Sequence, residues 1–97
     1  MKLGVRRNDS ERRYELVSDE GELIGLIDYR VTDSVIDLFH AETNPAHGGK
    51  GYGSQMVEGA LDDIRARGGL SVRASCSFVA DFFDKHPEYA DLVRPTS

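Results

Sequence analysis

Alternating apolar and polar residues dominate the first half of the chain and predict β-strands. Three such stretches cover residues 12–17, 22–31 and 35–43, and short polar segments typical of tight turns separate them. A short edge strand is expected over residues 3–6, within an otherwise irregular start. Consecutive strands joined by short turns favour an antiparallel meander. Gly25 interrupts one stretch, which indicates a β-bulge or the close approach of another backbone.

The hydrophobic period changes at Tyr52 from that of a strand to that of a helix. Apolar residues recur along one helical face as far as Ile64, and Gly68 and Gly69 then supply a C-cap. The predicted apolar stripe consists of Tyr52, Met56, Val57, Ala60, Leu61 and Ile64.

Beyond this helix the pattern predicts another strand and another helix. Residues 70–75 form the strand, and residues 77–85 form the helix, which Pro87 brings to an end. A strand–helix–strand unit has a right-handed crossover, so this strand is expected to lie parallel to the strand over residues 35–43. The whole chain, residues 1–97, is therefore predicted to be one α+β domain.

Composition narrows the classes of function. The net charge of −5 disfavours a nucleic acid as the main partner, because phosphates require a basic surface. The single cysteine, Cys76, excludes an internal disulfide and fits a reducing cytoplasm. No apolar run approaches the roughly 18 residues of a membrane helix, and the start of the chain does not have the pattern of a signal peptide. We therefore expect a cytoplasmic protein without a membrane partner, whose oligomeric state the sequence leaves open.

The glycines are unevenly distributed. Four of the ten lie within residues 48–53, between a predicted strand and the start of a predicted helix. Unpaired N–H groups and the positive end of the helix dipole favour an anion there, and glycines let several N–H groups converge on one phosphate. Lys50 adds a positive charge, whereas Gly51 stands where a Walker A loop needs Ser or Thr. The alternative is a flexible turn that only connects strand and helix.

This turn resembles the pyrophosphate loop of the GNAT acetyltransferase superfamily, Gln/Arg-x-x-Gly-x-Gly/Ala. Gly48 replaces the first residue, which removes that side chain but leaves the backbone cradle. More widely, the chain is similar to a branch of minimal GNAT-like proteins that lack the usual N-terminal strand and helices. The similarity runs from about Arg12 to Leu92 and includes the segments Cys76–Val79 and His86–Tyr89.

The resemblance implies a minimal GNAT fold, in which an antiparallel meander precedes a crossover with splayed parallel strands and a C-terminal helix. It also implies acetyl-coenzyme A as the donor, with its pantetheine arm between the strands over residues 35–43 and 70–75. The acceptor is expected to be an amine, either of a small molecule or of a protein lysine or N-terminus. The implied cofactor-binding residues are Phe39, Ala41, Thr43, His47, Gly48, Gly49, Lys50, Gly51, Tyr52, Gly53, Ser54, Ser77 and Phe82.

The resemblance also implies that Cys76 lies close to the reactive thioester. Cys76 stands just before the second predicted helix, whose N-terminus favours a thiolate. The thiolate could take the acetyl group and pass it to an amine, or the thiol could protonate the departing coenzyme A. A third interpretation is that Cys76 is a buried, inert side chain.

His40 and Glu42 are the candidates for the general base. They lie two residues apart on one face of the predicted strand, in continuation of the apolar face of Ile36 and Leu38. Either could accept the proton of an incoming ammonium group, although the strand could simply leave the core there. No metal site is expected, because the His, Glu and Cys residues do not have a recognisable ligand spacing.

Two other classes of function remain open at this stage. One is a coenzyme A-binding module with little or no turnover, and the other is a small interaction domain with a fortuitous glycine turn.

Overall fold

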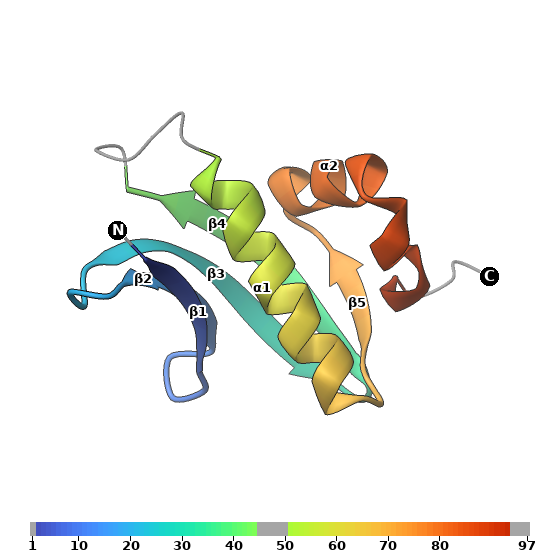
Figure 1. Cartoon of the computed structure of the whole chain (residues 1–97). Helices are drawn as coiled ribbons and strands as arrows, with labels where there is room; N and C mark the ends of the chain where they lie inside the picture. The colour runs from blue at the N-terminus through green and yellow to red at the C-terminus, as the bar shows by residue number, and fades with distance from the viewer. Residues whose placement is uncertain (1, 45–50, 94–97) are drawn as a thin grey trace.

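The computed structural model describes residues 2–44 and 51–93 of the chain. In that part, five strands form one sheet in the order β1-β2-β3-β4-β5 (Figure 1). The strands are β1 (Leu3–Asn8), β2 (Arg13–Ser18), β3 (Leu23–Thr32), β4 (Val35–Thr43) and β5 (Ser71–Ala74). Neighbours are antiparallel except for β4 and β5, which are parallel. The predicted meander and the predicted parallel strand are confirmed, and β1 extends two residues beyond the expected range.

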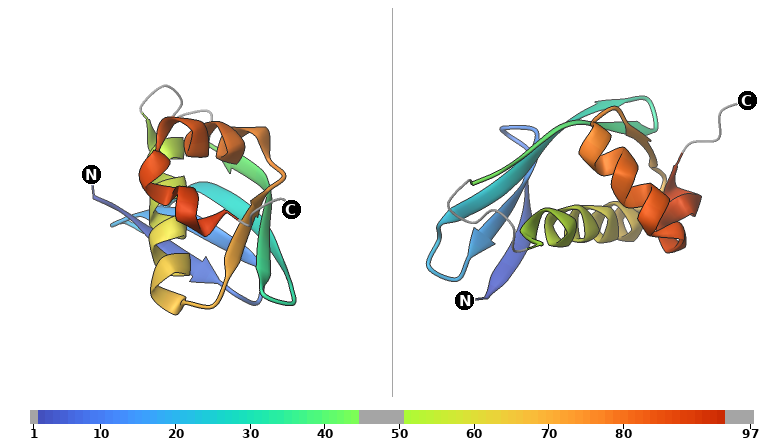
Figure 2. Two further views of the ribbon diagram at one scale, coloured as in Figure 1. Left: turned by 90° about the vertical axis from the view of Figure 1, so that its right-hand side faces the viewer. Right: turned by 90° about the horizontal axis from the view of Figure 1, so that it is seen from above.

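The helices lie on one face of the sheet (Figure 2). They are α1 (Tyr52–Arg67), α2 (Ser77–Lys85) and the 3-10 helix η2 (Pro87–Leu92). The bounds of α1 and α2 are those that the hydrophobic period predicts. Gly68 ends α1 with a positive φ of 71°, a backbone conformation that favours glycine. No helix in the described residues is long and apolar enough to cross a membrane.

The core lies between the sheet and the three helices. The sheet contributes buried residues such as Leu16, Ile27 and Leu38, and α2 contributes Val79 and Phe82. The buried residues of α1 are Met56, Val57, Ala60, Leu61 and Ile64, as predicted. Burial of these side chains fixes α1 across β1, β2 and β3.

Gly25 lies at a β-bulge, as its position in the sequence indicates. Leu16 of β2 faces Gly25, whereas Val17 faces Leu23, so Ile24 is an extra residue in β3. A Cβ atom at Gly25 would lie 2.8 Å from the carbonyl oxygen of Glu42. It would also lie 2.9 Å from Sδ of Met56 in α1, so only glycine fits here.

The face of the sheet opposite the helices carries a buried carboxylate. The Glu15 side chain is only 2% exposed and accepts hydrogen bonds from Arg6 and Arg13, each at 2.7 Å, and from Asn8 at 3.3 Å. Burial alone would raise the pKa of Glu15, but these donors outweigh it and leave the pKa below its ordinary value of 4.5. The contacts of Arg6 and Asn8 join β1 to β2, whereas the contact of Arg13 lies within β2.

Substitution of Gly25 tests the close approach of β3, β4 and α1. Gly25→Ala is expected to lower the free energy of unfolding by about 1–3 kcal/mol, because the new methyl group would meet a backbone oxygen that cannot move independently. Gly4→Ala in β1 is the matched control, since a Cβ atom there has no neighbour within 4 Å. Urea denaturation would measure both, and an equal effect of the two substitutions would contradict this account.

The Glu15 contacts predict how stability depends on pH. A carboxyl group whose pKa is lower in the folded state stabilises fully above its unfolded pKa, and that contribution is lost as the pH falls through the folded value. The free energy of unfolding should therefore fall between about pH 6 and pH 3, and Glu15→Gln should make this fall shallower. Glu20→Gln, in the exposed turn between β2 and β3, is the control and should leave the slope unchanged.

Candidate active site

β4 and β5 separate after a short stretch of pairing. Their parallel register runs from Val35 opposite Ser71 to Leu38 opposite Ala74. The carbonyl oxygen of Leu38 then accepts the N–H groups of both Ser75 and Cys76, each at 3.1 Å. Beyond this point β4 continues to Thr43 with β3 as its neighbour, and its other edge opens where β5 has turned away (Figure 1).

A second bulge lies at this same point of β4. Asp28 of β3 faces His40 and Tyr29 faces Leu38, so Phe39 is an extra residue without a partner in β3. A bulge bends its strand and increases its twist, which directs β4 away from β5. The predicted splay of the parallel strands therefore coincides with an irregularity within β4 itself.

The bulge reverses which side chains of β4 face the helices. Leu38 is buried before the bulge, and Ala41 packs against the core after it. His40 and Glu42 therefore lie on the opposite face of the sheet, where His40 is the cross-strand neighbour of Asp28. The prediction that they continue the face of Leu38 is wrong, because one inserted residue inverts the alternation of a strand.

His40 and Glu42 do share a face, as predicted. Nε2 of His40 lies 3.3 Å from Oε1 of Glu42, and the two side chains are 49% and 62% exposed. Such an exposed pair contributes little to stability, so the fold does not depend on it. Phe39, at the bulge, is also exposed and lies under the guanidinium group of Arg30, 4.9 Å from its ring centre.

Cys76 is the N-cap residue of α2, as its position before the predicted helix suggests. Its φ and ψ of −85° and 129° are extended, and its carbonyl oxygen accepts the N–H of Ala80 at 3.0 Å. The thiol is free, partly buried against the core, and does not cap the helix. Within residues 2–44 and 51–93, no hydrogen bond or ion pair links Cys76 to His40 or Glu42.

The start of α1 contains three of the predicted cofactor-binding positions that follow Gly51. Gly51 has a φ of 75°, which favours glycine, and its carbonyl oxygen accepts the first intrahelical hydrogen bond, from the N–H of Gln55. Ser54 is exposed at this end of α1 and Tyr52 is partly buried. A Cβ atom at Gly53 would lie 2.5 Å from the Phe78 ring, so this glycine is required for contact between α1 and α2.

Sequence reasoning missed the contact between Gly53 and Phe78, because nothing in a glycine cluster tells which member faces another helix. Four of the predicted cofactor-binding residues lie outside the described part of the chain. They are His47, Gly48, Gly49 and Lys50.

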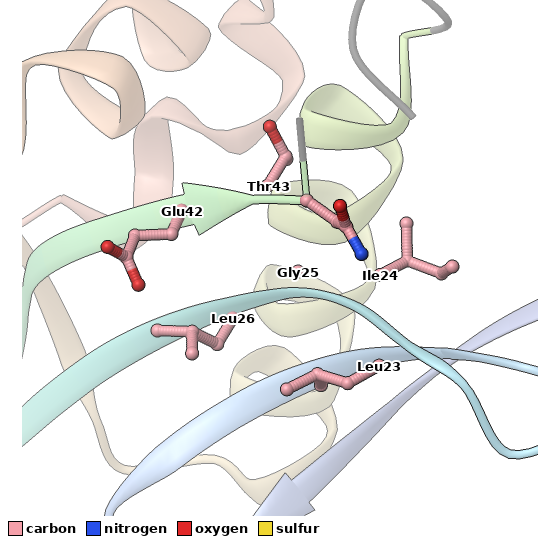
Figure 3. Close-up of a pocket in the computed structure, with 7 residues that line it drawn as sticks. Leu23, Ile24, Gly25, Leu26, Glu42 and Thr43 are labelled. Carbon is pink, nitrogen blue, oxygen red and sulfur yellow. The ribbon is translucent and has the colours of Figure 1, made fainter. Parts of the chain in front are cut away.

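The start of β3 and the end of β4 border a hollow of about 440 Å³ (Figure 3). Its lining residues are Leu23, Ile24, Gly25, Leu26, Glu42, Thr43 and Asn44. Glu42 and Thr43 are the predicted site residues in this set, and the others had not been predicted. The bulge at Gly25 was the available signal, since it interrupts the regular surface of the sheet here.

Two further predicted positions belong to α2. Ser77 is the exposed first residue of the helix, next to Cys76. Phe82 is only 4% exposed, and its ring stacks on His86 with a centroid distance of 4.0 Å. Its surroundings are therefore those of a core residue, and a contact with a cofactor remains a prediction.

Comparison with known proteins adds to this geometry. The chain matches the family model described as GCN5-related N-acetyl-transferase over residues 13–92. It is similar to a GCN5-like candidate N-acetyltransferase from Staphylococcus aureus, with 25% identity, 98% of this chain and 91% of that chain covered, and a TM-score of 0.71. Sequence comparison with curated proteins gives no match.

A larger enzyme shares the fold. The ribosomal-protein-S18-alanine N-acetyltransferase from Escherichia coli is 18% identical, with 77% of this chain covered and a TM-score of 0.61. The match covers 52% of that enzyme, so the present chain spans about half its length.

The position of Cys76 predicts that its thiol reacts in the folded protein. Because the side chain is only partly buried, iodoacetamide should modify it without unfolding, as followed by intact mass. Protein in urea provides the reference rate for a fully exposed thiol. Modification that occurs only at the rate of global unfolding would show instead that iodoacetamide cannot reach the Cys76 thiol in the folded protein.

Proposed function

Because the chain belongs to the GCN5-related N-acetyltransferase family, as its sequence resemblance predicts, we propose that it transfers an acetyl group from acetyl-coenzyme A to an amine. Membership of the family makes it an acyltransferase, and the donor, the acceptor and the residues involved form the proposal. The observation that carries it is the open edge of β4 beyond Leu38, next to the start of α2.

The donor fits the open edge by its chemistry. A strand edge presents unpaired N–H and C=O groups, and an extended chain of amides, such as the pantetheine arm, can pair with them. Residues 39–43 supply this edge. The glycine-rich turn before α1 supplies backbone N–H groups for the pyrophosphate, together with the positive end of the α1 dipole. Bound acetyl-coenzyme A supplies the activated acetyl group.

Cys76 can serve the reaction in two ways. In the covalent route the Cys76 thiolate attacks the acetyl carbonyl, the C–S bond to coenzyme A breaks, and free coenzyme A leaves. The amine nitrogen then attacks the Cys76 thioester and displaces the Cys76 thiolate. In the direct route its thiol gives a proton to the coenzyme A sulfur as the C–S bond breaks. Both routes need the sulfur near the point where β4 and β5 part, and the hydrogen bond from the Cys76 N–H to Leu38 supports this position.

The acceptor amine must lose a proton before or during the attack. Glu42 and His40 are the groups suited to accept it, directly or through water, because both are exposed and close to each other. Asp28 lies opposite His40 on the same face and adds negative charge. Asp28 also lies opposite Arg13, which offsets part of its charge, so the attraction of a cationic amine rests mainly on the net charge of −5 over longer range.

One observation favours a second candidate, a coenzyme A-binding module with little turnover. The proton acceptors lie on the face opposite the helices, and Cys76 packs against the core between sheet and helices, without a direct link to them in the described residues. Binding therefore requires fewer of these groups to cooperate than transfer does.

The two candidates differ in their products. The enzyme should release free coenzyme A only when an amine such as spermidine is present, and the covalent route also predicts an acetyl adduct by intact mass that Cys76→Ala removes. If Glu42 or His40 is the general base, its replacement by glutamine should lower kcat/KM by about 100-fold. The two variants are Glu42→Gln and His40→Gln. Glu58→Gln, on the exposed side of α1, is the control for loss of a carboxylate.

Each outcome has a distinct meaning. Release without an adduct would leave the direct route and exclude an accumulating acyl-enzyme. Thermal stabilisation by coenzyme A without release in a panel of amines would favour the binding module. The absence of both stabilisation and release would reject the proposed donor.

A further inference from the structure

Another hollow lies near the end of α1 and is lined by three arginines. It encloses about 450 Å³, and we call it the arginine hollow. Its lining residues are Asp9, Arg12, Tyr29, Arg30, Val31 and Arg67. The arginines come from three different elements, namely the turn between β1 and β2, strand β3, and the last residue of α1.

The arginines of the arginine hollow are not held in close ion pairs in the described part of the chain, where none of Arg12, Arg30 and Arg67 pairs with a carboxylate. The one acid in the lining, Asp9, accepts a hydrogen bond from Tyr29 and pairs with Arg7 at 3.1 Å. The Tyr29 hydrogen bond and the charges of Arg7 and Arg67 keep the pKa of Asp9 below its ordinary value. Asp9 thus holds one wall in place and leaves excess positive charge in a chain that is negative overall.

The backbone of Arg12 is unfavourable for an arginine. Its φ of 55° lies in the left-handed region, which glycine and asparagine adopt more readily. Two backbone hydrogen bonds fix this conformation. The Arg12 N–H donates to the backbone carbonyl oxygen of Asp9 at 3.2 Å, and the carbonyl oxygen of Arg12 accepts the Tyr29 N–H at 3.0 Å. Glycine would adopt this positive φ more readily, so the geometry of the turn does not explain why an arginine stands at this position.

The backbone of β3 adds a donor beside these side chains. The Tyr29 N–H points toward β2, and by the alternation of a strand the Val31 N–H points to the same side. β2 begins at Arg13, opposite Asp28, so no strand in the described residues pairs with Val31 on that side. The open edge is too short to receive a peptide strand, which favours a small ligand.

The arginine hollow is separate from the glycine-rich turn. Gly51 precedes α1 and Arg67 is its last residue, so the two features lie at opposite ends of this helix. The 16 residues of α1, at about 1.5 Å each, place about 24 Å between the two ends. A phosphate bound at the start of α1 would therefore leave the arginine hollow free.

We propose that the arginine hollow binds the phosphate group of a small molecule. Guanidinium groups form paired, charge-assisted hydrogen bonds with phosphate oxygens, and Arg12 and Arg67 supply two of them from different elements. The Arg30 guanidinium lies over Phe39, 4.9 Å from its ring centre, and would contribute a third only by turning toward the hollow. The Val31 N–H can serve a further oxygen. This inference does not depend on the proposed acetyl transfer, because none of these residues has been assigned a role in it.

Nuclear magnetic resonance tests the proposal directly. Isotope-labelled protein would be titrated with inorganic phosphate, and with phenyl phosphate as a monoester, at an ionic strength held constant with sodium chloride. The expected result is a saturable shift of the Val31 amide and of the Arg12 and Arg67 side-chain signals. Succinate, as a dicarboxylate of similar charge, is expected to bind more weakly.

Two variants separate binding from folding. Arg12→Gly relieves the left-handed backbone, so it should fold at least as stably as the parent protein while its phosphate affinity falls about ten-fold. Arg67→Gln should weaken binding to a similar degree. Arg73→Gln, an exposed arginine of β5 outside the arginine hollow, removes the same charge and should leave the affinity unchanged.

The proposal is overturned by any of three results. The first is shifts that do not saturate, or that spread over the surface. The second is an equal loss of affinity in all three variants, which would reflect net charge alone. The third is tighter binding of succinate than of phosphate.

Discussion

The carbonyl oxygen of Leu38 is the last point at which β4 holds the end of β5, and the arrangement of the candidate site depends on it. This oxygen accepts two N–H groups, from Ser75 and Cys76, and β5 then turns into α2. The bulge at Phe39 begins at the next residue of β4. Because the two events coincide, one edge of β4 opens while Cys76 stays attached to the strand that opens.

The same bulge divides the chemistry between two faces of the sheet. A one-residue insertion moves Ala41 toward the core and turns His40 and Glu42 to the side away from the helices. Exposed carboxylate and imidazole groups on that side can meet an acceptor without displacing packed side chains. Glu15 shows how the uncovered face is stabilised without a helix, because its carboxylate is paired with Arg6 of the neighbouring strand β1 and with Arg13 of its own strand.

Periodicity made most of the fold predictable, whereas the site depended on irregularities. The bounds of α1 and α2 and the parallel strand could be predicted from hydrophobic spacing, turn residues and the handedness of crossovers. The bulge at Gly25 left a signal, since glycine is unusual within a strand. The bulge at Phe39 left none, because an inserted aromatic residue fits either register, and the orientation of His40 and Glu42 was therefore predicted wrongly. The role of Gly53 against Phe78 was equally hidden, since it depends on a helix that comes later in the chain.

Charges of opposite sign lie close together along β3, and this limits what each region can attract. Asp28 faces His40, whereas Arg30, two residues further on the same strand, lines the arginine hollow. Two residues along a strand span only about 7 Å, which is within the screening length of about 8 Å at physiological ionic strength. The charges of Asp28 and Arg30 therefore partly offset each other, and neither region has the full field that its own charges would produce alone. Arg30 connects the two regions physically, because its guanidinium group lies over Phe39 at the bulge. An anion that drew Arg30 away from Phe39 would therefore act on the residue where β4 leaves β5.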